Sequence, residues 1–305
     1  MPRFTTAFLV LLFTTAASHS QPADILKPDP LAASLAQRHS DRWRELAGFV
    51  AARSSVAPAT ATFVTLSDDH IDNNGGIKPG ILRSLARRKR LVGISLRNTT
   101  ISSSAVSGLL VFKNRLLILD LYGTRIDDSC LEAIGSLLEL RELDLGVTRV
   151  TSSGLTALKP LKKLRTLDLS GRRINDDATA AIGTLTSLNH LSLAGTRITD
   201  AGLHALASLS RLRALGLAGT RIEGGSLDTL TRLPELTLLD LADTDITGDS
   251  LAGLANCRKL RALNLENCPL VVDSSTTHLA KLTTLQGLVL RKTGFEKESI
   301  TGAGL

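Results

Sequence analysis

The apolar residues of this chain follow a pattern that repeats every 24 residues. In the period that opens at Leu188, taken as position 1, apolar side chains occupy positions 4, 6, 11, 16, 19 and 22, and Thr196 occupies position 9. The first part alternates like a strand with one buried face, whereas positions 16, 19 and 22 recur at helical spacing. Each period therefore predicts one strand, one turn and one short helix.

The pattern fills most of the chain. A divergent first period carries Val64, Leu66 and Ile71 at positions 4, 6 and 11 and an insertion at 73–76. Later periods open at Leu91, Leu116, Leu140, Leu164, Leu188, Leu212, Leu236, Leu260 and Leu285, and those at Leu91 and Leu285 are offset by one extra residue. One such unit cannot bury its own apolar face, so we expect about ten units to stack into a single elongated domain.

Residues 196–203 read T-R-I-T-D-A-G-L, and related segments recur in the other units. This pattern resembles the leucine-rich repeat family, specifically the short repeats of bacterial proteins that are related to the cysteine-containing, ribonuclease-inhibitor-like class. The resemblance covers residues 61–305. It implies an α/β fold, a curved right-handed solenoid with parallel strands on the concave face and short helices on the convex face. It implies no particular activity, because the family is defined by a scaffold.

The first 20 residues are typical of a secretory signal. Arg3 supplies a positive charge, residues 7–13 form an apolar run, and residues 16–18 are small enough for cleavage. The run is too short to span a bilayer, and no other stretch approaches a membrane span. We therefore expect a secreted protein, or one of the periplasm or cell envelope.

Residues 21–60 predict a proline-broken linker and then an amphipathic helix. Asp29 and Pro30 are typical of a helix start, and Trp43 lies on the apolar face that follows. We expect this helix to cap the open end of the first repeat, with a partner-binding helix as the alternative. The other end has no polar capping repeat before Leu305. Either the last turn folds over itself or another chain covers it, which predicts possible self-association.

Net charge and residue content exclude some classes of function. The formal charge is only +7, with both signs spread along the chain, so nucleic-acid binding is not expected. Cys130, Cys257 and Cys268 take repeat positions held elsewhere by small residues, leucine and threonine, which predicts three buried free thiols. No motif for a metal or a cofactor is present, so neither is expected.

Threonine recurs at position 9, inside the expected core. A buried hydroxyl must be hydrogen-bonded, and the backbone of the adjacent turns is the available partner. Arg172 interrupts this ladder. Because an unpaired arginine is too costly to bury, we expect the loop to shift and release it.

Arginine recurs at position 10, which predicts a column of like charges about 5 Å apart. Its members are Arg125, Arg149, Arg173, Arg197 and Arg221. Two interpretations remain open. Acidic and amide residues that follow within three positions could form a solvated ion-pair rim with the column. Alternatively, the column is a contact strip for an anionic partner. Those neighbours are Asp127, Asp128, Asn175, Asp176, Asp200 and Glu223.

Positions 3, 5 and 7 are expected to face outward from the strands. Asp120, Asp144 and Asp168 then form an acidic stripe. A small apolar patch of Ile118, Tyr122 and Val147, with Leu117 at its margin, is expected beside it. Tyr122, the only tyrosine, is expected to be exposed there and to be a contact anchor for a partner.

His190 and Ser192 share a strand face with Asp168 on the neighbouring strand, the residue types of a hydrolytic triad. An open sheet offers neither a pocket nor oxyanion donors, so no catalysis is expected. The sequence favours a non-catalytic scaffold that binds a protein through its concave face. The alternative is a surface or envelope protein that recognises an anionic polymer or glycan through the arginine column.

Overall fold

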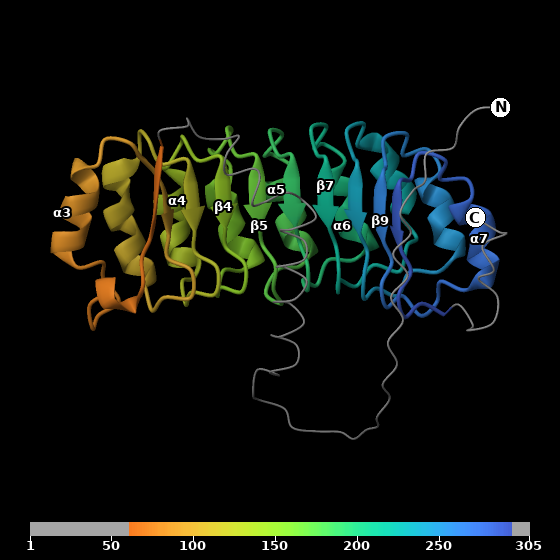
Figure 1. Cartoon of the computed structure of the whole chain (residues 1–305), viewed down its shortest axis with the longest axis horizontal. Coiled ribbons are helices and arrows are strands. Elements are labelled where there is room, and N and C mark those ends of the chain that lie inside the picture. Colours follow the sequence, from red (N-terminus) through yellow and green to blue (C-terminus); the bar gives the residue numbers. More distant parts are fainter. Residues whose placement is uncertain (1–60, 295–305) are drawn as a thin grey trace, which may run out of the picture.

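The computed structural model describes residues 61–294, which form one ten-stranded parallel sheet with the strands in sequence order (Figure 1). The strands are β1 (Thr62–Thr65), β2 (Leu91–Ser95), β3 (Ile118–Asp120), β4 (Glu142–Asp144), β5 (Thr166–Asp168), β6 (His190–Ser192), β7 (Ala214–Gly216), β8 (Leu238–Asp240), β9 (Ala262–Asn264) and β10 (Gly287–Val289). Each repeat supplies one strand, as the 24-residue pattern predicts.

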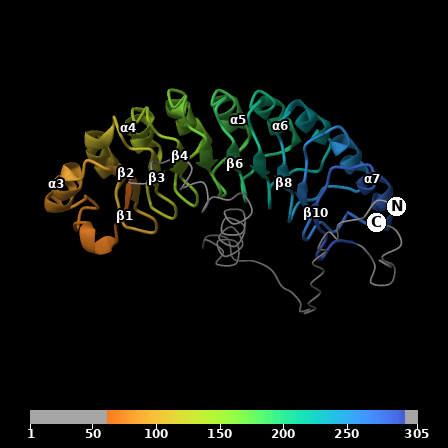
Figure 2. The same ribbon diagram turned by 45° about the horizontal axis from the view of Figure 1, so that its top comes forward.

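Short helices connect successive strands. The α-helices are α3 (Pro79–Arg87), α4 (Leu131–Gly135), α5 (Thr179–Ile182), α6 (Asp200–Leu206) and α7 (Thr276–Leu279). The 3₁₀ segments are η1 (Asp68–His70), η2 (Ser103–Phe112), η3 (Asp128–Cys130), η4 (Ser152–Leu158), η5 (Asp176–Ala178), η6 (Leu227–Arg232), η7 (Asp249–Leu254) and η8 (Asp273–Ser275). Figure 2 shows the strands along the inside of an arc and the helices along its outside. The expected leucine-rich-repeat solenoid architecture is confirmed.

Several units carry a 3₁₀ segment where the sequence predicts simply a short helix. In η4, for example, Leu155 and Leu158 are buried, and Leu161 continues the series. A 3₁₀ helix has three residues per turn, so side chains three apart lie on one face. The apolar positions 16, 19 and 22 are spaced by three, and the tighter helix therefore turns all of them toward the core.

The core is a set of parallel leucine columns. Position 4 is occupied by Leu143, Leu167 and Leu191 in adjacent strands, paired in register and at most 1% exposed. Leu193, at position 6 of its unit, is fully buried. Each of these side chains is enclosed by the repeats before and after it, so no single unit is stable by itself.

The threonine ladder is hydrogen-bonded as expected, but within its own turn. Each hydroxyl donates to the carbonyl three residues earlier, at position 6, over 2.6–3.0 Å. The donors are Thr99, Thr124, Thr148, Thr196, Thr220, Thr244 and Thr293. Arg172, which interrupts the ladder, is exposed, and Gly171 before it has φ 131°. The loop therefore shifts to release the arginine, as predicted.

A second set of bonds joins one repeat to the next. The carboxylate of Asp128 accepts from the backbone N–H and the hydroxyl of Thr151, over 2.8 and 2.6 Å. Asp176 accepts the same two bonds from Thr199, over 2.9 and 2.6 Å. Asp200 accepts from the N–H of Glu223 over 2.9 Å. These three aspartates, at position 13, join their turns to position 12 of the following repeat.

All three cysteines are buried free thiols, as predicted. The Cys130 thiol donates to the carbonyl of Asp127 over 3.2 Å, and the Cys268 thiol donates to the carbonyl of Leu241 over 3.1 Å. Burial raises the pKa of Cys130 to about 12 and that of Cys257 to about 11, and it raises the pKa of Cys268 as well.

The signal sequence expected at residues 1–20 and the capping helix with Trp43 lie outside the described residues. So do residues 295–305, at the end for which self-association is proposed. At that end Leu285, Leu288 and Leu290 are only partly buried. Self-association therefore stays a prediction.

Leu193→Asp tests the burial of the leucine columns. An unpaired carboxylate would then lie in the core, and we expect a loss of about 3 kcal/mol or more in the free energy of unfolding. Ala201→Asp is the matched control, because Ala201 is exposed in the first turn of α6 and should change stability by less than about 0.5 kcal/mol. Chemical denaturation followed by circular dichroism measures both, and equal losses would contradict the inside and outside assignment.

Asp176→Ala tests the bonds between repeats. It leaves the Thr199 N–H and hydroxyl without their acceptor, so we expect a loss of about 1–3 kcal/mol. Asp177→Ala is the control, because this exposed carboxylate accepts only from the Asn175 side chain, within its own repeat. Urea titration measures both variants, and a larger loss for Asp177→Ala would show that position 13 is not the residue that joins the repeats.

The cysteines should react slowly with an alkylating agent in the folded protein, because burial disfavours the reactive thiolate. Intact mass after brief iodoacetamide treatment should show no adduct without denaturant and three adducts in guanidinium. Rapid labelling of Cys130 in the native protein would show that position 15 is not packed.

Candidate binding surfaces

The three aspartates of the expected acidic stripe lie side by side on β3, β4 and β5. Each carboxylate accepts from the backbone N–H two residues later: Asp120 from Tyr122 over 3.1 Å, Asp144 from Gly146 over 3.0 Å and Asp168 from Ser170 over 2.8 Å. All three side chains are buried. The stripe therefore helps to hold the turn that follows each strand, a role that the sequence analysis did not anticipate.

Tyr122 is not the exposed anchor that the sequence predicts. The Arg97 guanidinium lies 4.2 Å from the centre of its ring, and Tyr122 is only 1% exposed. Arg97 also forms ion pairs with Asp120 at 3.2 Å and Asp144 at 3.4 Å. Arg97 and Tyr122 both occupy position 7, in adjacent repeats. This shared position was the sequence signal that the arginine could cover the tyrosine ring.

The apolar patch around Tyr122 is correspondingly small. Ile118 is 5% exposed, so it also belongs to the interior of the structure. Val147 is partly exposed and adopts φ 54°, on the turn after β4. Of the three predicted patch residues, the structure leaves only Val147 at the surface.

The arginine column lies along the edge of the sheet where the strands end. The backbone N–H of position 10 donates to the position 11 carbonyl of the preceding repeat: Arg149 to Ile126 over 2.8 Å, and Arg197 to Ile174 over 2.7 Å. Arg221 donates likewise to Ile198 over 2.9 Å, so these bonds fix the backbone of three of the five column residues. All five side chains are exposed, namely Arg125, Arg149, Arg173, Arg197 and Arg221.

The ion-pair rim expected as one interpretation of this column does not form. Between residues 61 and 294, none of the five arginines makes an ion pair. The nearby carboxylates of Asp128, Asp176 and Asp200 are occupied by the bonds between repeats. The pKa of Asp127 is lowered mainly by hydrogen bonds from Ser129 and Ser103, with the charge of Arg149 as the smallest contribution.

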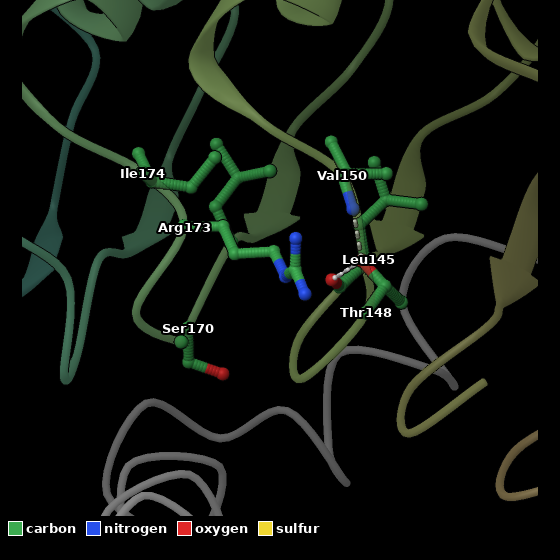
Figure 3. A pocket seen from close by; sticks show the side chains of 8 residues that line it. Leu145, Thr148, Val150, Ser170, Arg173 and Ile174 are labelled. Carbon is green, nitrogen blue, oxygen red and sulfur yellow. Dashed lines mark hydrogen bonds between the residues drawn. The ribbon is translucent and has the colours of Figure 1, made fainter. Parts of the chain in front are cut away.

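The irregular repeat leaves a small hollow in this edge. The hollow has a volume of about 10 Å³, enough for about one water molecule. In Figure 3 the Arg173 guanidinium points across it toward the turn that carries Thr148. Such a volume is too small for an organic ligand.

A larger basic groove lies at the opposite edge of the sheet, where the strands begin. It has a volume of about 620 Å³, and sequence reasoning missed it. The signal was arginine at position 2 in three of the four repeats, together with Lys162, Lys163 and Arg211 just before the next opening leucine. The lining residues are Arg141, Lys162, Lys163, Arg165, Ser187, Asn189, Arg211, Arg213 and Glu235.

His190, Ser192 and Asp168 do not form a catalytic relay. The Ser192 hydroxyl is buried and has no hydrogen-bond partner among the described residues. Burial, and to a smaller extent the charge of Arg213, lower the pKa of His190. Across residues 61–294 no cluster of three or more metal-ligating side chains occurs. None of the described helices is long and apolar enough to cross a membrane.

Comparisons with known proteins agree with this architecture. A leucine-rich repeat family model matches residues 162–222. The structure is similar to internalin C2 from Listeria monocytogenes, with 25% identity, 67% of this chain and 80% of that chain covered, and a TM-score of 0.52. It is also similar in fold to a leucine-rich repeat protein from Leptospira interrogans, with 19% identity, 70% of this chain and 58% of that chain covered, and a TM-score of 0.50.

No curated protein matches the sequence. The family match and the structural likeness both rest on the stacked repeats, with one strand and one short helix in each unit. Residues 162–222 match the leucine-rich repeat family, and residues 61–294 have the fold of a leucine-rich-repeat solenoid.

Proposed function

We propose that this chain is a non-catalytic recognition scaffold that binds a protein partner through the concave face and its arginine edge. The observation that carries the proposal is the arginine column, whose five side chains are exposed and make no ion pair among the described residues. An acidic surface on a partner would supply the missing counter-charges. The signal pattern of residues 1–20 supports action outside the cytoplasm, in the secreted medium, periplasm or cell envelope.

The dimensions of the column suit a protein interface. Five arginines on successive strands extend over about 19 Å. Arginine is enriched in interfaces, and opposite charges across an interface speed association and fix orientation. Val147 is the one residue of the predicted apolar patch left at the surface, and it lies two residues before Arg149. We therefore place the centre of the contact there, around Arg125 and Arg149.

An anionic polymer or glycan is the second candidate partner of the same column. The column arginines, which form no ion pairs within residues 61–294, favour this candidate as well. Regularly spaced negative groups on a polymer would match arginines at strand spacing. The two candidates differ in what the bound material is made of, and a capture experiment separates them.

For this test the full-length protein, immobilised on beads, is used to capture material from the envelope and medium of the cell that exports it. Arg149→Glu together with Arg197→Glu should abolish capture of a specific protein. The reversal places like charges at the interface, so affinity for that protein should fall at least tenfold, or about 1.4 kcal/mol.

Arg232→Glu together with Arg258→Glu is the matched control, because both side chains are exposed outside the column. It should capture as much as the wild-type protein. Captured material that survives protease but is lost on glycosidase treatment would support the polymer instead. Equal capture by all three proteins would contradict a role for the column.

A further inference from the structure

The basic groove, at the edge of the sheet where the strands begin, is lined mainly by positively charged side chains. Six of its lining side chains are cationic, and Glu235 is the only carboxylate among them. The groove spans the repeats that open at Leu140, Leu164, Leu188 and Leu212. It lies across the width of the sheet from the arginine column and shares no residue with it.

The sheet backbone fixes the spacing of these charges. The backbone carbonyl of Arg141 accepts from the backbone N–H groups of Arg165 and Thr166, over 2.8 and 3.0 Å. The backbone N–H of Asn189 donates to the carbonyl of Arg165 over 2.7 Å. The backbone N–H of Arg213 donates to the carbonyl of Asn189 over 2.8 Å. Arg141 and Arg165 therefore lie one strand apart, and Arg165 and Arg213 lie two strands apart, or about 10 Å.

Part of the charge is compensated at the margin of the groove. Lys163 pairs with Glu139 over 2.6 Å, and Glu235 pairs with Lys259 over 2.6 Å. Three arginines of the groove have no such partner among the described residues. Arg165, Arg211 and Arg213 are exposed and make no ion pair with any residue in 61–294.

The repulsion among these arginines has consequences for binding. The fold prevents them from separating, because their backbones belong to the sheet ladder. An anionic ligand would remove the repulsion and gain charge-assisted hydrogen bonds from several guanidinium groups at once. The volume of about 620 Å³ lies within the range of ligand sites in proteins.

The neutral part of the lining indicates the kind of anion. Ser187 and Asn189 lie between the arginines and offer a hydroxyl and an amide, which can bond to sugar hydroxyl groups. None of the groove's lining residues within 61–294 is aromatic. Single-stranded nucleic acids are usually bound by stacking of their bases on such rings, so the lining disfavours them.

We propose that this groove is a binding site for an acidic oligosaccharide, a sugar chain that carries sulfate or carboxylate groups. The arginines at position 2 bind the anionic groups of successive sugars, while Ser187 and Asn189 bind hydroxyl groups between them. The site is independent of the protein partner proposed above, because it lies at the other edge of the sheet.

The probe for the test is a fluorescently labelled heparin hexasaccharide, titrated with the full-length protein and followed by fluorescence anisotropy. Arg165→Ala together with Arg213→Ala should weaken binding at least tenfold. The double variant should also reduce the slope of log affinity against log salt by about two, since two anion contacts are lost. Arg165→Lys together with Arg213→Lys retains the charge and should keep most of the affinity.

The matched control is Arg173→Ala together with Arg221→Ala, which removes the same charge from the same two repeats at the opposite edge. It should change hexasaccharide affinity by less than twofold, and all variants should melt at the wild-type temperature because every altered side chain is exposed.

Three outcomes would overturn the proposal. Equal weakening by both alanine pairs would mean that binding follows net charge alone. An effect of the Arg173 and Arg221 pair alone would place the anionic ligand on the arginine column. Tighter binding of an oligothymidine of equal charge than of the hexasaccharide would make nucleic acid the better ligand.

Discussion

The structure depends on the stacking of one repeat against the next. A single unit of this chain has an apolar face that it cannot cover by itself, and position 4 and 6 leucines become buried only when units lie on both sides. The strands of successive units then pair in register from β2 to β10. Backbone positions are therefore set at strand spacing whatever the outward side chains are, and like charges can be held close together at the edges.

The same stacking determines the hydrogen-bond partners of the polar side chains. Threonines at position 9 bond within their own turn, and aspartates at position 13 bond to the following repeat. The aspartates at position 5 accept from the backbone of the turn after their strand. The aspartates at positions 5 and 13 thus use their carboxylates in hydrogen bonds inside the structure. Many arginines, in contrast, remain at the surface. A modest formal charge of +7 thus conceals a strongly uneven distribution of exposed charge.

The two edges of the sheet offer different chemistry. The arginine column at the C-terminal edge is a single line of cations, bordered by Val147 and the concave face. The basic groove at the N-terminal edge is hollow and combines cations with Ser187 and Asn189. A line of charge suits the flat acidic surface of a protein, whereas a hollow suits a ligand that enters it. The two proposed ligands would occupy opposite edges of the sheet and would not compete for one surface.

By itself the sequence determined the number of repeats, the strand and helix in each, the buried leucine and cysteine positions, and the release of Arg172 from the core. These follow from periodicity, because one repeat position has nearly the same surroundings in every unit. Only the tertiary structure decided which polar groups meet. Arg97 covers Tyr122, the position 13 aspartates bond across repeats instead of neutralising the arginine column, and residues from several repeats form the basic groove. These contacts join residues that are 20 or more positions apart, and the choice among competing partners depends on side-chain direction and on distance in the stacked repeats, neither of which the order of residues specifies.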